Sequence, residues 1–148
     1  MLTSNVRIAE DDSVAELAAM IFRVCVPCSI GERSIAIDSH LNRISVAYRF
    51  QSGATGVVHS RIQFTVHEQN NEAWIGDLFV KPDLRLSGAG TQLVRAAESL
   101  VVKLDVAAIN VWPLNKSEGF WQKMGYSPHQ SISRALSKRV TRSCDRPS

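Results

Sequence analysis

The sequence predicts an α/β domain built on a mixed β-sheet, and three observations carry this prediction. From Arg43 onward, "RISVAYRF" and "TGVVHSRIQFTVHE" alternate apolar and polar residues, the pattern of strands with one buried face. The segments "AWIGDLFV" and "VAAINVW" are apolar on both faces, as buried central strands are. Between them, apolar residues recur at helical spacing from Leu93 to Leu104, which predicts an amphipathic helix that packs on the sheet.

Each remaining element follows from a local signal. "NVRIA" alternates like a short first strand, and Asp11 or Asp12 can cap a helix over "SVAELAAMIFRV". The segment "SIAIDSHLNR" is ambiguous, and a second short helix is one interpretation of it. "NKSEGFWQKMGY" predicts a short helix that ends at Gly125, and "SISRALSKRV" a last strand. The predicted order is therefore β-α-(α)-β-β-β-α-β-α-β.

The size and composition are those of one globular domain. The chain has 148 residues, of which 45% are apolar and 21% are charged. No apolar run approaches the roughly 20 residues that a membrane-spanning helix needs, and the acidic start does not resemble a secretory signal. We expect a cytoplasmic protein with no membrane partner, one domain over residues 1–140 and a flexible basic tail at 141–148.

The charge pattern and the cysteine spacing argue against a nucleic-acid partner and against a metal site. The formal charge of +3 arises mainly at the C-terminal end, where residues 131–148 hold five Lys/Arg and one Asp. A short basic end is typical of a solvated tail, so we do not expect nucleic acid as a partner. The sequence contains three cysteines, an odd number that fits reduced thiols. "CVPC" has no second Cys or His pair to complete a zinc set, so we predict no metal site.

The stretch "LFVKPDLRLSGAGTQLV" joins a strand to a helix through a glycine-rich turn. A strand that stops at Pro82 and a helix that begins near Gly90 leave the first backbone N–H groups of that helix exposed. These donors and the positive end of the helix dipole suit an anion. Gly88 and Gly90 let an anion approach the backbone, and Arg85 adds a positive charge. The residues therefore predict a phosphate-binding turn, with a plain chain reversal as the alternative.

Two common phosphate motifs do not match this turn. A mononucleotide P-loop requires G-x-x-x-x-G-K-[ST], and no Lys-Ser/Thr pair follows the glycines. A dinucleotide turn requires a third glycine where the chain has Leu93, and it normally opens a parallel βαβ unit. The ligand is therefore expected to be of another class.

The turn resembles the acetyl-CoA signature of the GNAT superfamily of N-acetyltransferases, because "RLSGAG" has the form R-x-x-G-x-G and follows "LFVKPDL". "VRIAEDDSVAELAAM" looks like the first strand and helix of that family, and "INVWPLNKSEGFWQKMGY" is similar to its later strand, Asn and helix. The similarity covers roughly residues 5–140. It implies a mostly antiparallel central sheet of six to seven strands with about four flanking helices and two splayed central strands.

The resemblance also implies acetyl-CoA as the cosubstrate. In the family, the pyrophosphate lies on the glycine turn, and the pantetheine arm pairs with the preceding strand like an extra strand. The positions that match the coenzyme-binding ones are Leu78, Phe79, Val80, Arg85, Leu86, Ser87, Gly88, Ala89, Gly90, Thr91, Asn115, Ser117 and Trp121.

The implied reaction is transfer of an acetyl group to a primary amine by direct attack in a ternary complex. The amine can belong to a small molecule, a lysine or a protein N-terminus. The base is expected on the strand before the turn, where alternation puts Glu72, Trp74, Gly76 and Leu78 on one face and Asp77 on the other. Glu72 is the first candidate, and Asp77 becomes one if a bulge shifts the alternation.

The acid is where the sequence departs from the family. The family commonly has a tyrosine at the position of Trp121, and an indole cannot titrate. Tyr126 is a further candidate, although its position is commonly a core Phe; a thiol with a pKa of about 8.5 can also leave without an acid. The departure keeps a second function open, a non-catalytic acyl-CoA-binding regulatory module. A homodimer is compatible with either function.

Overall fold

The computed structural model describes residues 2–26, 31–114 and 116–140, and gives no side chains for residues 2–12, 84, 86 and 87. The predicted tail at 141–148 and the predicted coenzyme ligand Asn115 therefore lie outside the described residues.

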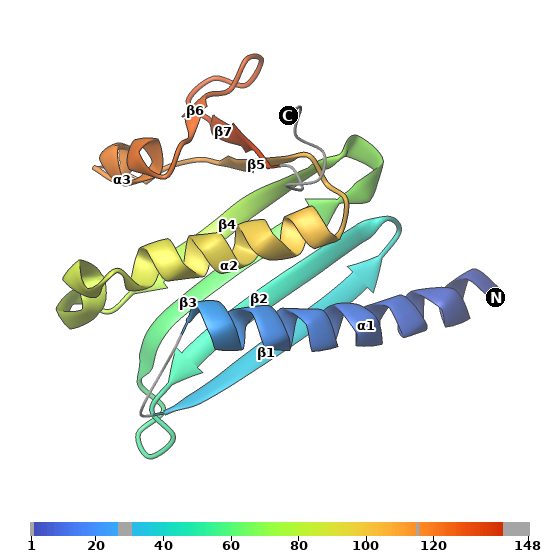
Figure 1. Cartoon of the computed structure of the whole chain (residues 1–148), viewed down its shortest axis with the longest axis horizontal. Coiled ribbons are helices and arrows are strands. Elements are labelled where there is room, and N and C mark those ends of the chain that lie inside the picture. The colour runs from blue at the N-terminus through green and yellow to red at the C-terminus, as the bar shows by residue number, and fades with distance from the viewer. Residues whose placement is uncertain (1, 27–30, 115, 141–148) are drawn as a thin grey trace.

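Seven strands form one mixed sheet in the order β1-β2-β3-β4-β5-β7-β6 (Figure 1). They are β1 (Glu32–His40), β2 (Arg43–Gln51), β3 (Val58–His67), β4 (Glu72–Val80), β5 (Ala108–Val111), β6 (Ser127–Pro128) and β7 (Leu136–Arg139). All neighbours are antiparallel except β4 and β5, which are parallel. The prediction of a mixed, mostly antiparallel sheet is confirmed.

Three α-helices accompany the sheet, where about four were expected. They are α1 (Leu2–Cys25), α2 (Ala89–Lys103) and the short α3 (Glu118–Lys123), and two 3₁₀ turns are η1 (Glu68–Asn70) and η2 (Pro82–Ser87). Helices α1 and α2 lie side by side on one face of the sheet, whereas α3 lies near the end of β5 (Figure 1). No described helix is both long and apolar enough to span a lipid bilayer.

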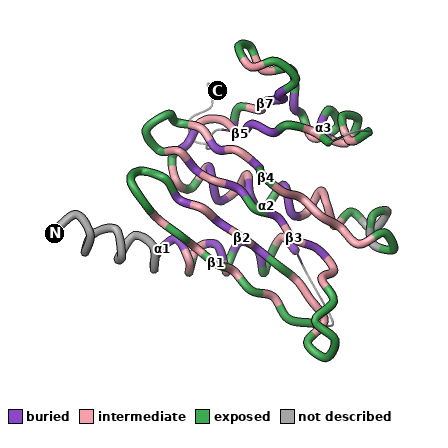
Figure 2. The backbone as a smooth tube through the Cα atoms, turned by 180° about the vertical axis from the view of Figure 1, so that it is seen from behind, coloured by how far each residue is buried: buried purple, intermediate pink, exposed green. Residues whose placement is uncertain are grey.

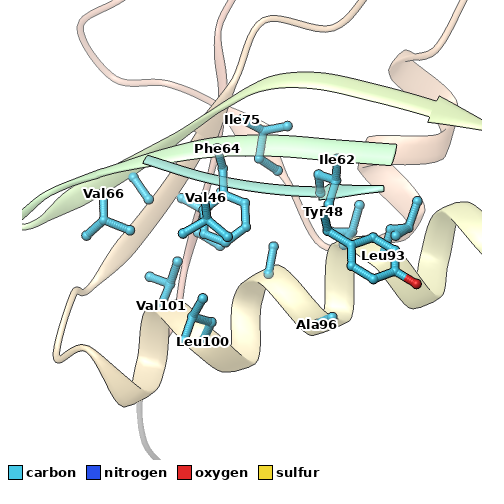
Figure 3. Packing of buried hydrophobic residues seen from close by; sticks show 14 of the residues in the cluster. Val46, Tyr48, Ile62, Phe64, Val66, Ile75, Leu93, Ala96, Leu100 and Val101 are labelled. Carbon is cyan, nitrogen blue, oxygen red and sulfur yellow. The ribbon is translucent and has the colours of Figure 1, made fainter. Parts of the chain in front are cut away.

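The core lies between the sheet and the two long helices. Alternate residues of β2 and β3 point toward α2, and they include Val46, Tyr48, Ile62 and Phe64 (Figure 3). Leu93, Leu100 and other apolar residues of α2 meet them, which confirms the predicted amphipathic helix. The tube in Figure 2 shows buried and less buried residues alternating along these strands, as expected when one face of a sheet is covered.

The predicted first strand at residues 5–9 is wrong, because this segment belongs to α1. The helix then has no N-terminus at Asp11 or Asp12. "NVRIA" contains only two alternating apolar residues, and no Gly or Pro separates it from the helix that follows. Extending a formed helix adds one hydrogen bond per residue, whereas a strand would need a free sheet edge next to β2, and β1 already occupies it.

The short helix considered for residues 34–43 is also wrong. This segment forms most of β1, in which exposed and half-buried residues alternate along the whole strand. Leu41 and Asn42 close the β1–β2 hairpin with φ values of 47° and 62°. A two-residue turn with both φ values positive is the type I′ turn that matches the twist of paired strands. The sequence did not predict it, because Leu is not a residue that favours this conformation.

We expect Leu41→Gly to stabilise the fold. The side chain of Leu41 is 79% exposed, so little packing is lost, and glycine adopts a positive φ without the steric cost that a leucine incurs. The free energy of unfolding in urea should rise by roughly 0.5–1 kcal/mol. Leu114→Gly is the matched control, because Leu114 is 78% exposed but has no positive φ. That substitution should lower the free energy of unfolding. If Leu41→Gly lowers it as well, the leucine at this φ is not strained.

Candidate functional site

Strands β4 and β5 separate halfway along β4. Residues Glu72–Ile75 pair with Ala108–Val111, and β5 then ends while β4 continues to Val80. The predicted splay between two central strands is confirmed. The second half of β4 consequently has a backbone edge that no strand of the described chain covers.

The free edge of β4 presents hydrogen-bonding groups of known direction. The N–H of Lys81 donates to the carbonyl of His59, on the β3 side, at 2.8 Å. Because successive N–H groups of a strand point to opposite sides, those of Leu78 and Val80 point toward the splay. An extended amide-containing chain can therefore pair with these two residues.

The glycine turn opens α2 beside the end of β4. Gly88 has a φ of 87°, in the left-handed region, and directly precedes the helix. The first helical hydrogen bond runs from Gln92 N–H to the Gly88 carbonyl at 3.0 Å. The N–H groups of Ala89, Gly90 and Thr91 therefore have no partner within the helix, and no described side chain caps them. Three backbone donors and the positive helix end face one position, as the sequence predicted for an anion site.

Arg85 and Gly90 connect the turn to the end of β4 and to α3. The Arg85 Nε donates to the Val80 carbonyl at 3.0 Å, which ties η2 to the end of β4 and leaves the other guanidinium donors for a ligand. A Cβ at Gly90 would lie 3.5 Å from the Phe120 ring and 3.7 Å from Val80 Cγ2. The end of β4, the start of α2 and the side chain of Phe120 on α3 thus meet at one place.

Two other residues that were predicted to bind the coenzyme contact other groups of the protein. Ser117 precedes α3, and its Oγ donates to the Leu114 carbonyl at 2.6 Å. Trp121 is buried, and its ring meets the edges of Phe120 and Tyr126 at 5.0 Å and 5.2 Å between centroids. Its place in the core accounts for an aromatic residue at this position.

The predicted alternation of side chains along β4 is wrong, because a bulge interrupts it. Gln63 pairs with Asp77, but the next residue, Phe64, pairs with Ile75, so Gly76 is the extra residue of β4. Beyond the bulge, Leu78 turns toward the core and Asp77 shares the opposite face with Glu72. The condition under which Asp77 becomes a candidate base is therefore met.

Asp77 is the carboxylate at the start of the splay. Its Oδ2 accepts a hydrogen bond from Arg61 Nε at 2.6 Å, and the Arg61 guanidinium also lies 4.8 Å from the centroid of the Phe79 ring. Both side chains of the ion pair are more than a third exposed, so it orients Asp77 more than it stabilises the fold. Its other oxygen, Oδ1, can accept from a water or an amine.

Glu72 lies in the paired part of β4 and holds two neighbours. Its Oε2 accepts from Asn110 Nδ2 at 2.8 Å, and its Oε1 accepts a long hydrogen bond from Trp74 Nε1 at 3.4 Å. Five residues separate Glu72 from Asp77, which is roughly 15 Å along a strand. The two candidate carboxylates therefore lie on the same face of the strand but at different positions along it.

Tyr126 lies on the helix side of the molecule, away from the face of Asp77. Its hydroxyl donates to Glu98 Oε2 at 2.8 Å, and Glu98 also pairs with Lys138 at 3.1 Å. Burial raises the pKa of Tyr126 above its usual range, and the charge and hydrogen bond of Glu98 raise it further. These contacts give the hydroxyl a partner in the core.

We expect Tyr126→Phe to change stability rather than acyl transfer. Loss of a hydrogen bond to a charged group should lower the free energy of unfolding by about 1.5–3 kcal/mol. Because the folded-state pKa of Tyr126 lies above the unfolded value of about 10, its stability contribution is complete below that pH and is lost above it. The wild-type protein should therefore lose stability above pH 10 more steeply than Tyr126→Phe. A tenfold fall in transfer rate with unchanged stability would instead indicate that Tyr126 is an acid.

Sequence reasoning missed three residues of this region. Asn110 and Trp112 lie in and just after β5, and Arg61 lies on β3. A polar Asn inside the apolar segment "VAAINVW" was the available signal, because a buried amide needs partners. The ion pair of Arg61 could not be read from the sequence, since its register depends on the bulge at Gly76.

Comparison with known proteins gives one family and one fold. The sequence model of the acetyltransferase (GNAT) family matches residues 33–126. No curated protein gave a match to this sequence.

Three solved structures illustrate the shared fold. GCN5 from Tetrahymena has 15% sequence identity and a TM-score of 0.54, with 68% of this chain and 70% of that chain covered. An acetyltransferase from Bacillus cereus ATCC 14579 has 18% identity and a TM-score of 0.56, with 66% and 74% covered. The PaiA N-acetyltransferase from Thermoplasma acidophilum, in complex with coenzyme A, has 16% identity and a TM-score of 0.52, with 67% and 62% covered. At these identities the similarity is one of fold.

Proposed function

The chain belongs to the GNAT family of acyl-CoA-dependent acetyltransferases, and on this premise we propose that it transfers an acetyl group from acetyl-CoA to a primary amine. The observation that carries the proposal is the free edge of β4, which ends beside the glycine turn at the start of α2. An extended chain can pair along the edge while its diphosphate lies on the turn. Coenzyme A has this combination of groups, and it is the ligand named for the Thermoplasma relative.

The proposed coenzyme position follows from the directions of the donors. The N–H groups of Leu78 and Val80 pair with the amides of the pantetheine arm, and one N–H near Val80 polarises the thioester carbonyl. The N–H groups of Ala89 to Thr91 bind the pyrophosphate, with Arg85 at the mouth of the turn. Phe79 contributes backbone to the same edge, and we retain Asn115, Ser117 and Trp121 as positions around the coenzyme.

The proposed chemistry is a direct attack on the thioester. The free amine forms a bond to the carbonyl carbon, the bond to sulfur breaks, and the amine loses a proton to a base. Asp77 is the carboxylate closest to the free edge along the strand and on the open face, so we assign the proton to it, directly or through a water. The thiolate leaves without a protein acid, since a thiol has a pKa of about 8.5.

Glu72, the first candidate from the sequence, has a supporting role in this proposal. Its two hydrogen bonds hold Asn110 and Trp74 rather than a group at the splay. The function therefore depends on Glu72 through the residues that it positions. Glu72→Gln keeps the shape of the side chain and should reduce the transfer rate less than loss of the Asp77 carboxylate.

The test is release of free thiol from acetyl-CoA in the presence of a panel of small amines, peptides with lysine and peptides with a free N-terminus. Thiol release that depends on the amine, with the acetylated amine identified by mass, supports the proposal. Tight binding of coenzyme A without turnover of any amine would favour the second function, the acyl-CoA-binding regulatory module. That function remains the alternative because the chain has Trp121 where the family commonly has a tyrosine.

A further inference from the structure

We propose that the acceptor of this transferase is a primary aliphatic amine joined to an aromatic ring by a short linker, and that Trp74 and Trp112 form the surface on which this ring stacks. The inference rests on the proposed function, because it names the substrate class of the same site. It starts from a group of aromatic side chains on the face of the sheet opposite α1 and α2.

Two tryptophans, one on β4 and one directly after β5, form a flat surface. The Trp74 and Trp112 rings have centroids 4.4 Å apart and planes 27° apart, so they stack. The His129 ring lies 6.2 Å from Trp74 at 23°, and its Nδ1 accepts from the N–H groups of Ser131 and Ile132 at 3.0 Å each. The surface is therefore held from three segments of the chain.

One ring of this surface remains open to solvent. Trp112 is 56% exposed, whereas Trp74 is half-buried beneath it. Tryptophan is enriched at binding surfaces, because its ring offers a large apolar contact area. A flat ligand ring can contact the exposed part of Trp112.

The surface lies at the mouth of the splay. Trp112 follows Val111, the last residue of β5 that pairs with β4. Trp74 and Asp77 share a face of β4, with only the bulge between them. If the ring of the ligand stacks on Trp112, a short aliphatic chain would bring its amine to Asp77 and the thioester.

The polar groups beside the rings hold Trp74 in place on this face. Glu72 holds the Trp74 indole and the Asn110 amide, and it has no ion pair with another described residue. Asn110 is 1% exposed, and its Oδ1 is buried with no hydrogen-bond partner among the described residues. A buried acceptor without a partner is unusual, and a bound water would satisfy it.

Direct binding in the presence of coenzyme A tests the inference without relying on turnover. We would measure the Kd of phenethylamine and of 2-cyclohexylethylamine by calorimetry, since the two amines differ in aromaticity but hardly in size. We expect phenethylamine to bind roughly threefold to tenfold more tightly. Trp112→Ala should remove this difference, and Leu114→Ala, at a neighbouring exposed apolar residue, should preserve it.

Three results would overturn the inference. They are equal affinities for the two amines, no binding of either, or an aromatic preference that survives Trp112→Ala. Tighter binding of 1,4-diaminobutane than of phenethylamine would also overturn it, because the site would then select a second positive charge. Failure of the proposed function is distinguishable, since it would appear as absence of thiol release with any amine while the aromatic preference in binding persists.

Discussion

Gly88→Asp should abolish most of the affinity for coenzyme A. Gly88 directly precedes α2, and a Cβ at this position would meet no atom within 4 Å. The introduced carboxylate would therefore lie at the helix N-terminus without a steric clash, although the positive φ strains the backbone, and it would repel the pyrophosphate. Two like charges about 4 Å apart repel by about 1 kcal/mol in water and about 4 kcal/mol near a protein surface, so the Kd should rise at least about tenfold.

Gly56→Asp is a control of the same chemistry and the same backbone strain. Gly56 has a φ of 71° and likewise no atom within 4 Å of its Cβ, but it lies in the loop between β2 and β3. Both variants should lose similar stability in urea, and calorimetry with coenzyme A should separate them. If the two variants bind coenzyme A with equal affinity, the turn at the start of α2 is not part of the coenzyme site.

Asp77→Asn should lower kcat by roughly a hundredfold or more, the scale on which a positioned base contributes. The amide keeps the shape of the side chain but cannot take the proton of the amine. The fold should persist, since the exposed ion pair with Arg61 contributes at most about 1 kcal/mol. The measurement is the initial rate of thiol release at saturating acetyl-CoA over a range of pH.

Two further variants distinguish the role of Asp77 from a general effect of charge. Asp38→Asn removes an exposed carboxylate from β1, which two strands separate from β4, and should leave kcat within about twofold. Glu72→Gln should have an intermediate effect through Trp74 and Asn110. If Glu72→Gln reduces kcat by more than Asp77→Asn, the base is Glu72 and the assignment to Asp77 is wrong.

Periodicity predicted most of the sheet and the helix that covers it. The strand around Phe64 and the apolar side of α2 could be predicted because their periodicity indicates burial on one face, and the strand around Ile75 because its segment is apolar on both faces. The N-terminal part of α1 and the strand β1 were predicted wrongly. In both segments the local pattern is short, and the available sheet edge decided between helix and strand.

The coenzyme turn and the candidate base differ in what makes them predictable. Arg85, Gly88 and Gly90 are contiguous in the chain, and backbone N–H groups at a helix start bind anions wherever that helix lies. The sequence alone therefore determined the family resemblance and the position of the predicted anion site. The geometry of such a local motif is determined by residues that are adjacent in the chain.

Only the tertiary structure decided which side chains meet on the open face. The bulge at Gly76 brings Asp77 onto the face of Glu72, and the end of β5 brings Trp112 onto Trp74. A shift of one residue in strand pairing moves every later side chain to the other face. Such a shift depends on contacts between strands that are distant in sequence, so the proposed base and the proposed acceptor surface follow from the fold rather than from the motif.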